Sequence, residues 1–189
     1  KSASSRHDLE GRNNLLAFAL ASSAQTGLVA EFGVHQGETI NFLAAHLSSG
    51  DIIHGFDSFQ GLPEGWFFGR QPGHFSLGGH QPECREEVVL HPGWFADSLP
   101  AFLAEHPEPF RFVHIDSDLY SSARDVFYLA RSRFVAGTVI VFDEYFNYPG
   151  WEQHEFRAFQ EFVSGTRARY EYIAVAPRPL KVPVRVPQL

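Results

Sequence analysis

Residues 28–44 read LVAEFGVHQGETINFLA, and this stretch sets the expectation for the whole fold. It begins with a short apolar run and passes through a turn that contains Gly33 and Gly37. A helical pattern of apolar residues then runs from Thr39 to Leu47. A strand, a glycine turn and a helix in this order form the first unit of a parallel α/β sheet.

The same succession repeats along the chain. Further apolar runs, typical of strands buried on both faces, lie at residues 51–58, 87–93, 110–118 and 137–145, and helical patterns at Ser98–His106, Ser121–Arg133 and Trp151–Ser164. An opening helix is expected from His7 to Thr26, ending at Gly27. Two final runs, 170–176 and 180–186, are joined by three residues, which allows only an antiparallel hairpin. We therefore predict a doubly wound, Rossmann-like α/β fold with five βα units, helices on both faces and a C-terminal hairpin.

Length and composition indicate one domain spanning residues 1–189, with residues 1–27 as a helical lead. The chain is 44% hydrophobic, and 15 Lys and Arg against 22 Asp and Glu give a net charge of −7. The sequence has no block of basic residues that would favour binding to nucleic acid. Its apolar stretches are also much shorter than the roughly 20 residues that a membrane-spanning helix needs. Cys84 is the single cysteine, which favours a reducing compartment. We expect a cytoplasmic protein without nucleic-acid or membrane partners, and the sequence leaves a homo-oligomer open.

The longest irregular segment runs from Gly61 to Glu86 and is rich in glycine and proline. A loop of this length in a compact domain is usually functional or disordered. Its aromatic residues, Trp66, Phe67, Phe68 and Phe75, favour a loop that packs onto something. We therefore predict a lid, or substrate loop, over residues 61–86.

The turn after the first strand has features of an adenosyl site. Its pattern, E-x-G-x-x-x-G from Glu31 to Gly37, lacks the G-x-G-x-x-G spacing that binds a dinucleotide pyrophosphate. Asp57 ends the next strand and is placed to accept hydrogen bonds from both hydroxyls of a ribose. Thr39, near the helix start, could hold a carboxylate. The pattern favours an adenosyl ligand with an amino-acid tail, although the glycines alone also suit an ordinary tight turn.

Four acids follow the fourth and fifth predicted strands: Asp116, Asp118, Asp143 and Glu144. If these strands are neighbours, about 4.8 Å apart, their end residues can converge on one ion. Carboxylates without Cys or His favour a hard cation such as Mg²⁺. The alternative is that these acids are solvated residues of separate loops. After the third strand, Trp94 and Phe95 are candidates for packing against an adenine ring.

At this point a family resemblance becomes clear. The segments EFGVHQGETINFLA, HGFDSFQGLPEGW, FVHIDSDLYSSARDVF and GTVIVFDEYFNYPGWEQHEFRAF resemble the macrocin O-methyltransferase family, over about residues 28–163. Members of that family use S-adenosylmethionine and Mg²⁺ to methylate sugar hydroxyls of natural products. The resemblance implies a mostly parallel, seven-stranded methyltransferase sheet. It departs at Glu144, where the family often has a second aspartate. We expect this chain to lack the longer N-terminal portion that helps cover the substrate in family members. The resemblance therefore implies no particular acceptor.

The resemblance also implies roles for residues. Glu31, Gly33, Gly37 and Thr39 would line the methionine part of the cofactor, and Asp57 and Ser58 would meet its ribose. Asp116, Asp143 and Glu144 would hold the cation, and Asp118 would be the catalytic base. The complete predicted cofactor site consists of Glu31, Gly33, Val34, Gly37, Thr39, Asp57, Ser58, Phe59, Gly93, Trp94, Phe95 and Asp116.

The function expected from these residues is methyl transfer from S-adenosylmethionine to a hydroxyl of a small molecule, a sugar or a natural-product diol, assisted by a divalent cation. Two alternatives remain open. The domain could bind an adenosyl ligand without catalysis, or it could be a metal-dependent hydrolase that uses only the acidic residues. A nicotinamide oxidoreductase would share the fold, but the glycine spacing opposes it.

Overall fold

The computed structural model describes residues 3–67, 69–174 and 182–188. Its sheet has the order β3-β2-β1-β4-β5-β7-β6. The strands are β1 (Leu28–Phe32), β2 (Ile53–Asp57), β3 (Val88–Pro92), β4 (Phe110–Ile115), β5 (Phe134–Phe142), β6 (Arg169–Tyr172) and β7 (Val182–Gln188). The first five are parallel, and β7 is antiparallel to β5 and β6. The predicted sheet is confirmed, while the expected turn at 177–179 lies outside the described residues.

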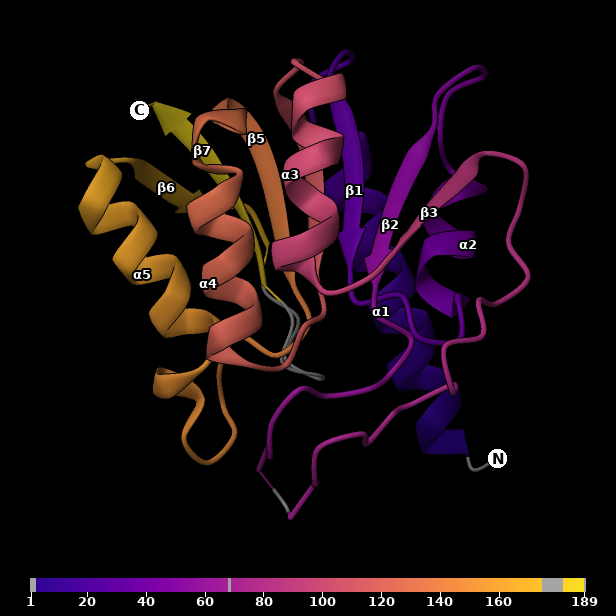
Figure 1. Cartoon of the computed structure of the whole chain (residues 1–189). Helices are drawn as coiled ribbons and strands as arrows, with labels where there is room; N and C mark the ends of the chain where they lie inside the picture. Colours follow the sequence, from indigo (N-terminus) through magenta and orange to yellow (C-terminus); the bar gives the residue numbers. More distant parts are fainter. Residues whose placement is uncertain (1–2, 68, 175–181, 189) are drawn as a thin grey trace.

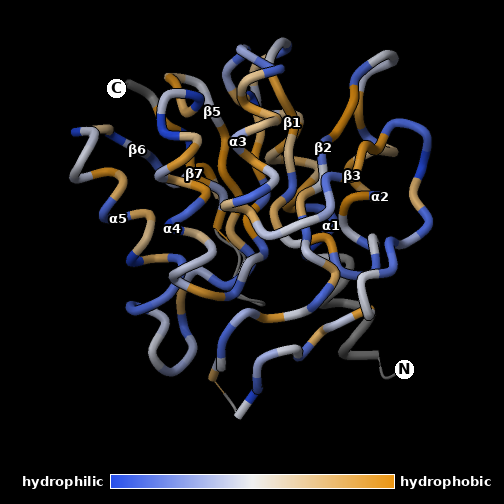
Figure 2. The backbone as a smooth tube through the Cα atoms, viewed as in Figure 1, coloured by the Kyte–Doolittle hydropathy of each residue, from blue (hydrophilic) through white to orange (hydrophobic). Residues whose placement is uncertain are grey.

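Helices cover both faces of this sheet, as predicted (Figure 1). On one face lie α1 (Ala3–Ala21) and α2 (Glu38–Ala44), and on the other α3 (Phe95–Glu105), α4 (Tyr120–Leu129) and α5 (Glu155–Thr166). Each face has its own apolar core, and Figure 2 shows hydrophobic residues concentrated along the central strands. Among the described residues, no helix combines the length and apolar content needed to cross a bilayer.

Phenylalanine rings fill the core between the sheet and α3, α4 and α5. Phe32 and Phe56, on neighbouring strands, are fully buried and stack with ring centroids 4.9 Å apart. Phe127 of α4 packs against Phe134 of β5 and Phe162 of α5. Burying a side chain of this size contributes about 1.5–3 kcal/mol. This core holds the strand ends, and therefore the residues that follow them, in fixed positions.

The first helix is shorter at its C-terminal end than predicted. It ends at Ala21 rather than Thr26, because the hydroxyls of Ser22 and Ser23 donate hydrogen bonds to the carbonyls of Phe18 and Leu20. Gly27 does not cap this helix. It has φ +121° at the entry to β1, where a Cβ would lie 2.8 Å from the Pro109 carbonyl oxygen.

Other boundaries also differ from the prediction. β5 begins at Phe134 and continues through Gly137 at φ +95°, whereas residue 137 was the expected start. α3 begins at Phe95, three residues before the expected Ser98. None of the described residues between β2 and β3 is helical, so this connection is an irregular loop. The described residues form four βα units rather than the expected five. Closely spaced glycines and prolines between β2 and β3 prevent a helix in that connection.

Three histidines pack together on the α3 side of the sheet. The His54 Nδ1 atom lies 3.0 Å from His91 Nε2, and the His54 ring also lies 5.0 Å from that of His106. Burial, and then the proximity of His91 and His106, lowers the pKa of His54 to about 4. Burial also lowers the pKa of His91, against the opposing effect of Glu105. The cluster therefore favours the neutral state of His54 and His91 in the folded protein.

Stability should consequently fall in mild acid. Between pH 6.5 and about 4 the unfolded chain protonates His54 while the folded chain does not, so the stability present above pH 6.5 is progressively lost. We expect His54→Phe to reduce this loss, measured as the free energy of unfolding in urea at pH 7.5 and pH 5. His80→Phe, at an exposed loop histidine, is the control and should keep the wild-type slope. Equal slopes in all three proteins would contradict the assignment.

Candidate functional site

The strand order reverses between β1 and β4, and the chain is very tightly packed there. The Gly33 amide bonds to the Phe56 carbonyl, and the Asp116 amide bonds to the Phe32 carbonyl, both at 2.9 Å. Gly33 has φ +96°, and a Cβ on it would lie 1.8 Å from the Asp116 carbonyl oxygen. The glycine expected to admit a ligand is therefore also required by the adjacent strand end. In open parallel sheets this reversal point is where ligands bind.

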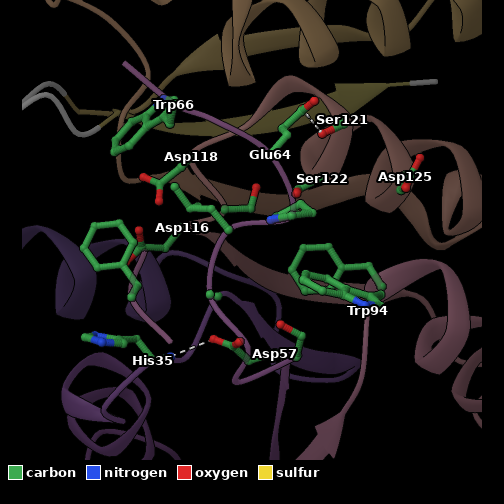
Figure 3. A pocket seen from close by; sticks show the side chains of 18 of the residues that line it. His35, Asp57, Glu64, Trp66, Trp94, Asp116, Asp118, Ser121, Ser122 and Asp125 are labelled. Carbon is green, nitrogen blue, oxygen red and sulfur yellow. Dashed lines mark hydrogen bonds between the residues drawn. The ribbon is translucent and has the colours of Figure 1, made fainter. Parts of the chain in front are cut away.

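A cavity of about 630 Å³ lies at this edge, within the range typical of small-molecule sites. The end of β2, the β3–α3 turn, the residues after β4, the first turns of α4 and part of the 61–86 loop form its walls. Figure 3 shows labelled side chains from these elements lining one pocket, with Asp57 and Trp94 apart from Asp116 and Asp118. Among the predicted site residues, the lining includes Gly33, Asp57, Ser58, Gly93, Trp94, Phe95, Asp116, Asp118 and Glu144.

Asp57 joins the turns that follow β1 and β2. Its Oδ2 atom accepts hydrogen bonds from the backbone amides of Val34 and His35, each at 2.8 Å. Its Oδ1 atom accepts one from the Phe59 amide at 2.7 Å. A carboxylate oxygen can accept two hydrogen bonds, so Oδ2 is filled and Oδ1 can accept one more, which suits one ribose hydroxyl rather than the two expected from the sequence. His35 and Phe59 both have left-handed backbones, at φ 47° and 55°, which these bonds help to hold.

Five of the predicted cofactor residues do not line the cavity. They are Glu31, Val34, Gly37, Thr39 and Phe59. Val34 and Phe59 act on the site through their amide bonds to Asp57. Gly37 precedes α2 at φ +79°, and Thr39 is buried within that helix. Direct contacts of these residues with a cofactor stay predictions, as do those of the lining residues.

The acidic residues after β4 and β5 come together as two overlapping groups. In one, a carboxylate oxygen each of Asp116, Asp118 and Glu144 lie within 4.8 Å of one another. In the other, the same distance joins Asp116 and Asp143 to a ring nitrogen of His114. The predicted ligands Asp143 and Glu144 therefore belong to different groups that share Asp116. This arrangement makes Asp118 a possible ligand as well as the predicted base.

Glu144 is an acid of this site whose pKa is strongly raised. Burial, followed by the nearby carboxylates of Asp116 and Asp118, raises its pKa well above the usual range. Its buried Oε2 atom has no hydrogen-bond partner among the described residues. A hard divalent cation at the three oxygens would offset this repulsion and supply the missing partner. The residues present therefore fit such an ion.

His114 links Glu31 to Asp143 beneath the site. The Nδ1 atom lies 3.0 Å from the Glu31 Oε2 atom, and Nε2 lies 3.4 Å from the Asp143 Oδ1 atom. Glu31 and His114 are fully buried and paired in register on adjacent strands. This arrangement was not predicted. Its only signal was an ionisable residue in each of two apolar runs, and pairing the two residues required knowledge of the strand order.

Part of the 61–86 loop lines the cavity, and contacts to α4 and within the loop hold it there. Ser121 Oγ on α4 donates a 2.6 Å hydrogen bond to Glu64, visible in Figure 3. The Arg70 guanidinium lies 4.6 Å from the centroid of the Trp66 ring and 5.5 Å from that of Phe75. All five residues line the cavity. The geometry suits the predicted lid, whose function stays a prediction.

Asp118 adopts an unusual backbone conformation. It has φ +62°, in the left-handed region, and the Leu119 amide bonds to the Ser117 carbonyl at 2.6 Å across it. A hydrogen bond from residue i+2 to residue i around a central residue with positive φ forms a rare and strained type of γ-turn. Such strain persists only where the surrounding structure holds it, and it is concentrated at functional sites.

Comparison with known proteins agrees with this fold. The solved structure of CalS11, a calicheamicin methyltransferase, is 24% identical with a TM-score of 0.70, covering 97% of this chain and 80% of that one. For the O-methyltransferase NovP the identity is 20% and the TM-score 0.72, with coverage of 94% and 80%. An O-methyltransferase from Bacillus cereus in complex with SAH is 21% identical with a TM-score of 0.60, and the match covers 94% of this chain and 80% of that one. These likenesses show the fold.

The comparison of sequences gives the family. No curated protein matches the chain. The model of a methyltransferase domain matches residues 30–145, a range that extends from β1 to the residues just after β5. This range contains both the Asp57 turn and the acidic residues of the cavity. It covers more than half of the chain, which therefore belongs to the methyltransferase domain family.

Proposed function

We propose that this protein transfers a methyl group from S-adenosylmethionine to a hydroxyl of a small molecule, with help from a divalent cation and a carboxylate base. One observation carries the proposal. A single cavity has Asp57 at one part of its wall and the carboxylates of Asp116, Asp118 and Glu144 at another. Membership of the methyltransferase domain family supports a methyl donor as the first ligand.

The donor would bind along the edge formed by β1, β2 and β3. Asp57 and Ser58 would bind the ribose, and Trp94 and Phe95 would pack against the adenine, since all four line the cavity. The sulfonium is already a reactive methyl donor, so the protein mainly positions the acceptor oxygen for in-line displacement. The methyl group moves to that oxygen, and S-adenosylhomocysteine leaves.

The acidic residues would prepare the acceptor. Asp116 and Glu144, which share one group, would hold Mg²⁺ or another hard cation, with Asp143, the third ligand expected from the sequence, approaching from the neighbouring group that shares Asp116. When bound, this ion would lower the pKa of an acceptor hydroxyl. Asp118, in the same cluster, would accept the proton released from that hydroxyl. The proton therefore passes to a side chain whose strained backbone places it beside Asp116 and Glu144.

The acceptor would be a sugar or a natural-product diol. The wall near the loop combines aromatic rings, Trp66 and Phe75, with the polar groups Glu64 and Ser121, a mixture suited to a hydroxylated molecule. One structural neighbour is described as a TDP-rhamnose 3'-O-methyltransferase of calicheamicin biosynthesis. We accordingly propose a role in natural-product biosynthesis, in the cytoplasm, with a small molecule rather than nucleic acid or membrane as partner.

Thermal unfolding tests the donor and the cation separately. S-adenosylhomocysteine at about 100 times its dissociation constant should add roughly 2.7 kcal/mol and raise the midpoint by several degrees. Adding Mg²⁺ together with a diol should increase this shift further, and NAD should give none. No shift with S-adenosylhomocysteine would overturn the proposed donor and favour a hydrolase. A rise in the unfolding midpoint that is the same with and without Mg²⁺ would favour an adenosyl-binding domain without metal-assisted catalysis.

A further inference from the structure

Glu155 is a buried carboxylate directly behind the acidic residues of the cavity. It begins α5 and is 0% exposed. Its Oε1 atom accepts a hydrogen bond from the Ser117 backbone amide at 3.0 Å and lies 3.4 Å from the hydroxyl oxygen of Ser117. The backbone of Asp118 donates a further hydrogen bond to this carboxylate. Burial raises the pKa of Glu155 well above its usual range, and its Oε2 atom has no hydrogen-bond partner among the described residues, so the amide contacts act against this shift without cancelling it.

The two amides that Glu155 binds belong to the strained turn. Asp118 is its central residue, at φ +62°, and the Leu119 amide bonds across it to the Ser117 carbonyl. Without an acceptor for the Ser117 and Asp118 amides, this turn would lose bonds that oppose its strain. The side chain of Asp118 would then no longer be fixed beside Asp116 and Glu144.

We propose that Glu155 is a positioning residue: it holds the 117–119 turn and thereby places the Asp118 carboxylate. The inference rests on the proposed function, in which Asp118 accepts the acceptor's proton. Glu155 lies outside the cavity lining and is hydrogen-bonded to the turn at the Ser117 amide. Its role is therefore distinct from those of the cation ligands and the base.

A helix-terminal charge effect is the alternative explanation. An acid in the first turn of a helix stabilises it through the helix dipole, whether or not it binds another segment. Two substitutions separate the explanations. Glu155→Gln keeps an oxygen that accepts the two amide bonds but cannot ionise, whereas Glu155→Asp keeps the carboxyl group but is too short to reach the same amides.

Amide hydrogen exchange gives the first readout. Exchange at Ser117 and Asp118 should be roughly tenfold or more faster in Glu155→Asp and Glu155→Met, while the amides of β4 remain protected. Glu155→Gln should stay near the wild-type rates. Glu152→Met removes an exposed carboxylate three residues earlier and should also leave them unchanged. Unchanged protection in Glu155→Asp, or equal loosening in Glu155→Gln, would overturn the proposal; if Glu155→Met does not fold, Glu155→Asp decides.

Turnover gives the second readout. With binding of S-adenosylhomocysteine intact, Glu155→Asp should lower kcat on the order of 10²-fold, and Glu155→Gln should restore most of it. In an Asp118→Asn background the same Glu155 substitution should change kcat by less than about twofold, because its effect acts through Asp118. If the Glu155 and Asp118 substitutions lower kcat by fully additive amounts of activation free energy, the proposal is overturned. If Asp118→Asn has no effect at all, the proposed base fails instead, and hydrogen exchange still decides whether Glu155 holds the turn.

Discussion

Replacing Asp118 by asparagine should lower turnover by roughly 10²-fold or more while binding of the donor and the cation persists. Asparagine has nearly the same size and keeps an oxygen beside Asp116 and Glu144, but it cannot accept the acceptor's proton. The measurement is the rate of S-adenosylhomocysteine formation with a diol acceptor and Mg²⁺. Calorimetric titration with S-adenosylhomocysteine should give the wild-type affinity.

The control for this prediction is Asp125→Asn, a carboxylate that also lines the cavity but belongs to the second turn of α4. It removes the same charge from the same cavity without touching the 117–119 turn. Its turnover should stay within a few-fold of the wild type. If Asp118→Asn retains wild-type turnover, Asp118 has no part in the mechanism.

Gly33→Ala should have the largest effect on stability, a loss of about 3 kcal/mol or more. The added Cβ would lie 1.8 Å from the Asp116 carbonyl oxygen, a backbone atom that cannot move without separating β1 from β4. The residue also has φ +96°, which alanine rarely adopts. Urea unfolding measures the loss, and the donor affinity should fall with it because both walls of the reversal point shift.

Gly50→Ala provides the matched control. Gly50 has a similar left-handed backbone, φ +87°, but a Cβ there would meet nothing within 4 Å. Its cost should therefore be limited to backbone strain, roughly 1 kcal/mol. Equal costs at the two positions would show that strain alone, rather than the close approach of Asp116, explains the need for glycine at residue 33.

Much of the fold could be predicted because it depends on local patterns. The apolar runs that form β1 to β5 are short, nearly continuous and separated by turn residues. These features are typical of buried parallel strands, so the strands could be predicted. The position of Asp57 could be predicted because the carboxyl ends of neighbouring parallel strands lie at the same edge of the sheet. The end of α1 was missed because it depends on Ser22 and Ser23 competing for backbone carbonyls.

The parts of the site that could not be predicted depend on distant pairings. Ser117 and Glu155 are 38 residues apart, and Glu31 and His114 are 83 apart. Nothing in the local sequence of either partner specifies the other. The division of Asp143 and Glu144 between two groups has the same origin, since consecutive residues direct their side chains differently once the strand has ended.

The helix-free connection between β2 and β3 has a consequence for how this protein can diversify. A crossover helix would be fixed to the core along its whole apolar face, whereas this loop is bonded at separate points, such as Glu64 to Ser121 and the backbone of Glu83 and Arg85 to Asn41. Doubling the length of a loop costs only about 0.6 kcal/mol in closure entropy. Insertions and deletions here can therefore alter which molecules are admitted while the strand ends beneath remain in register.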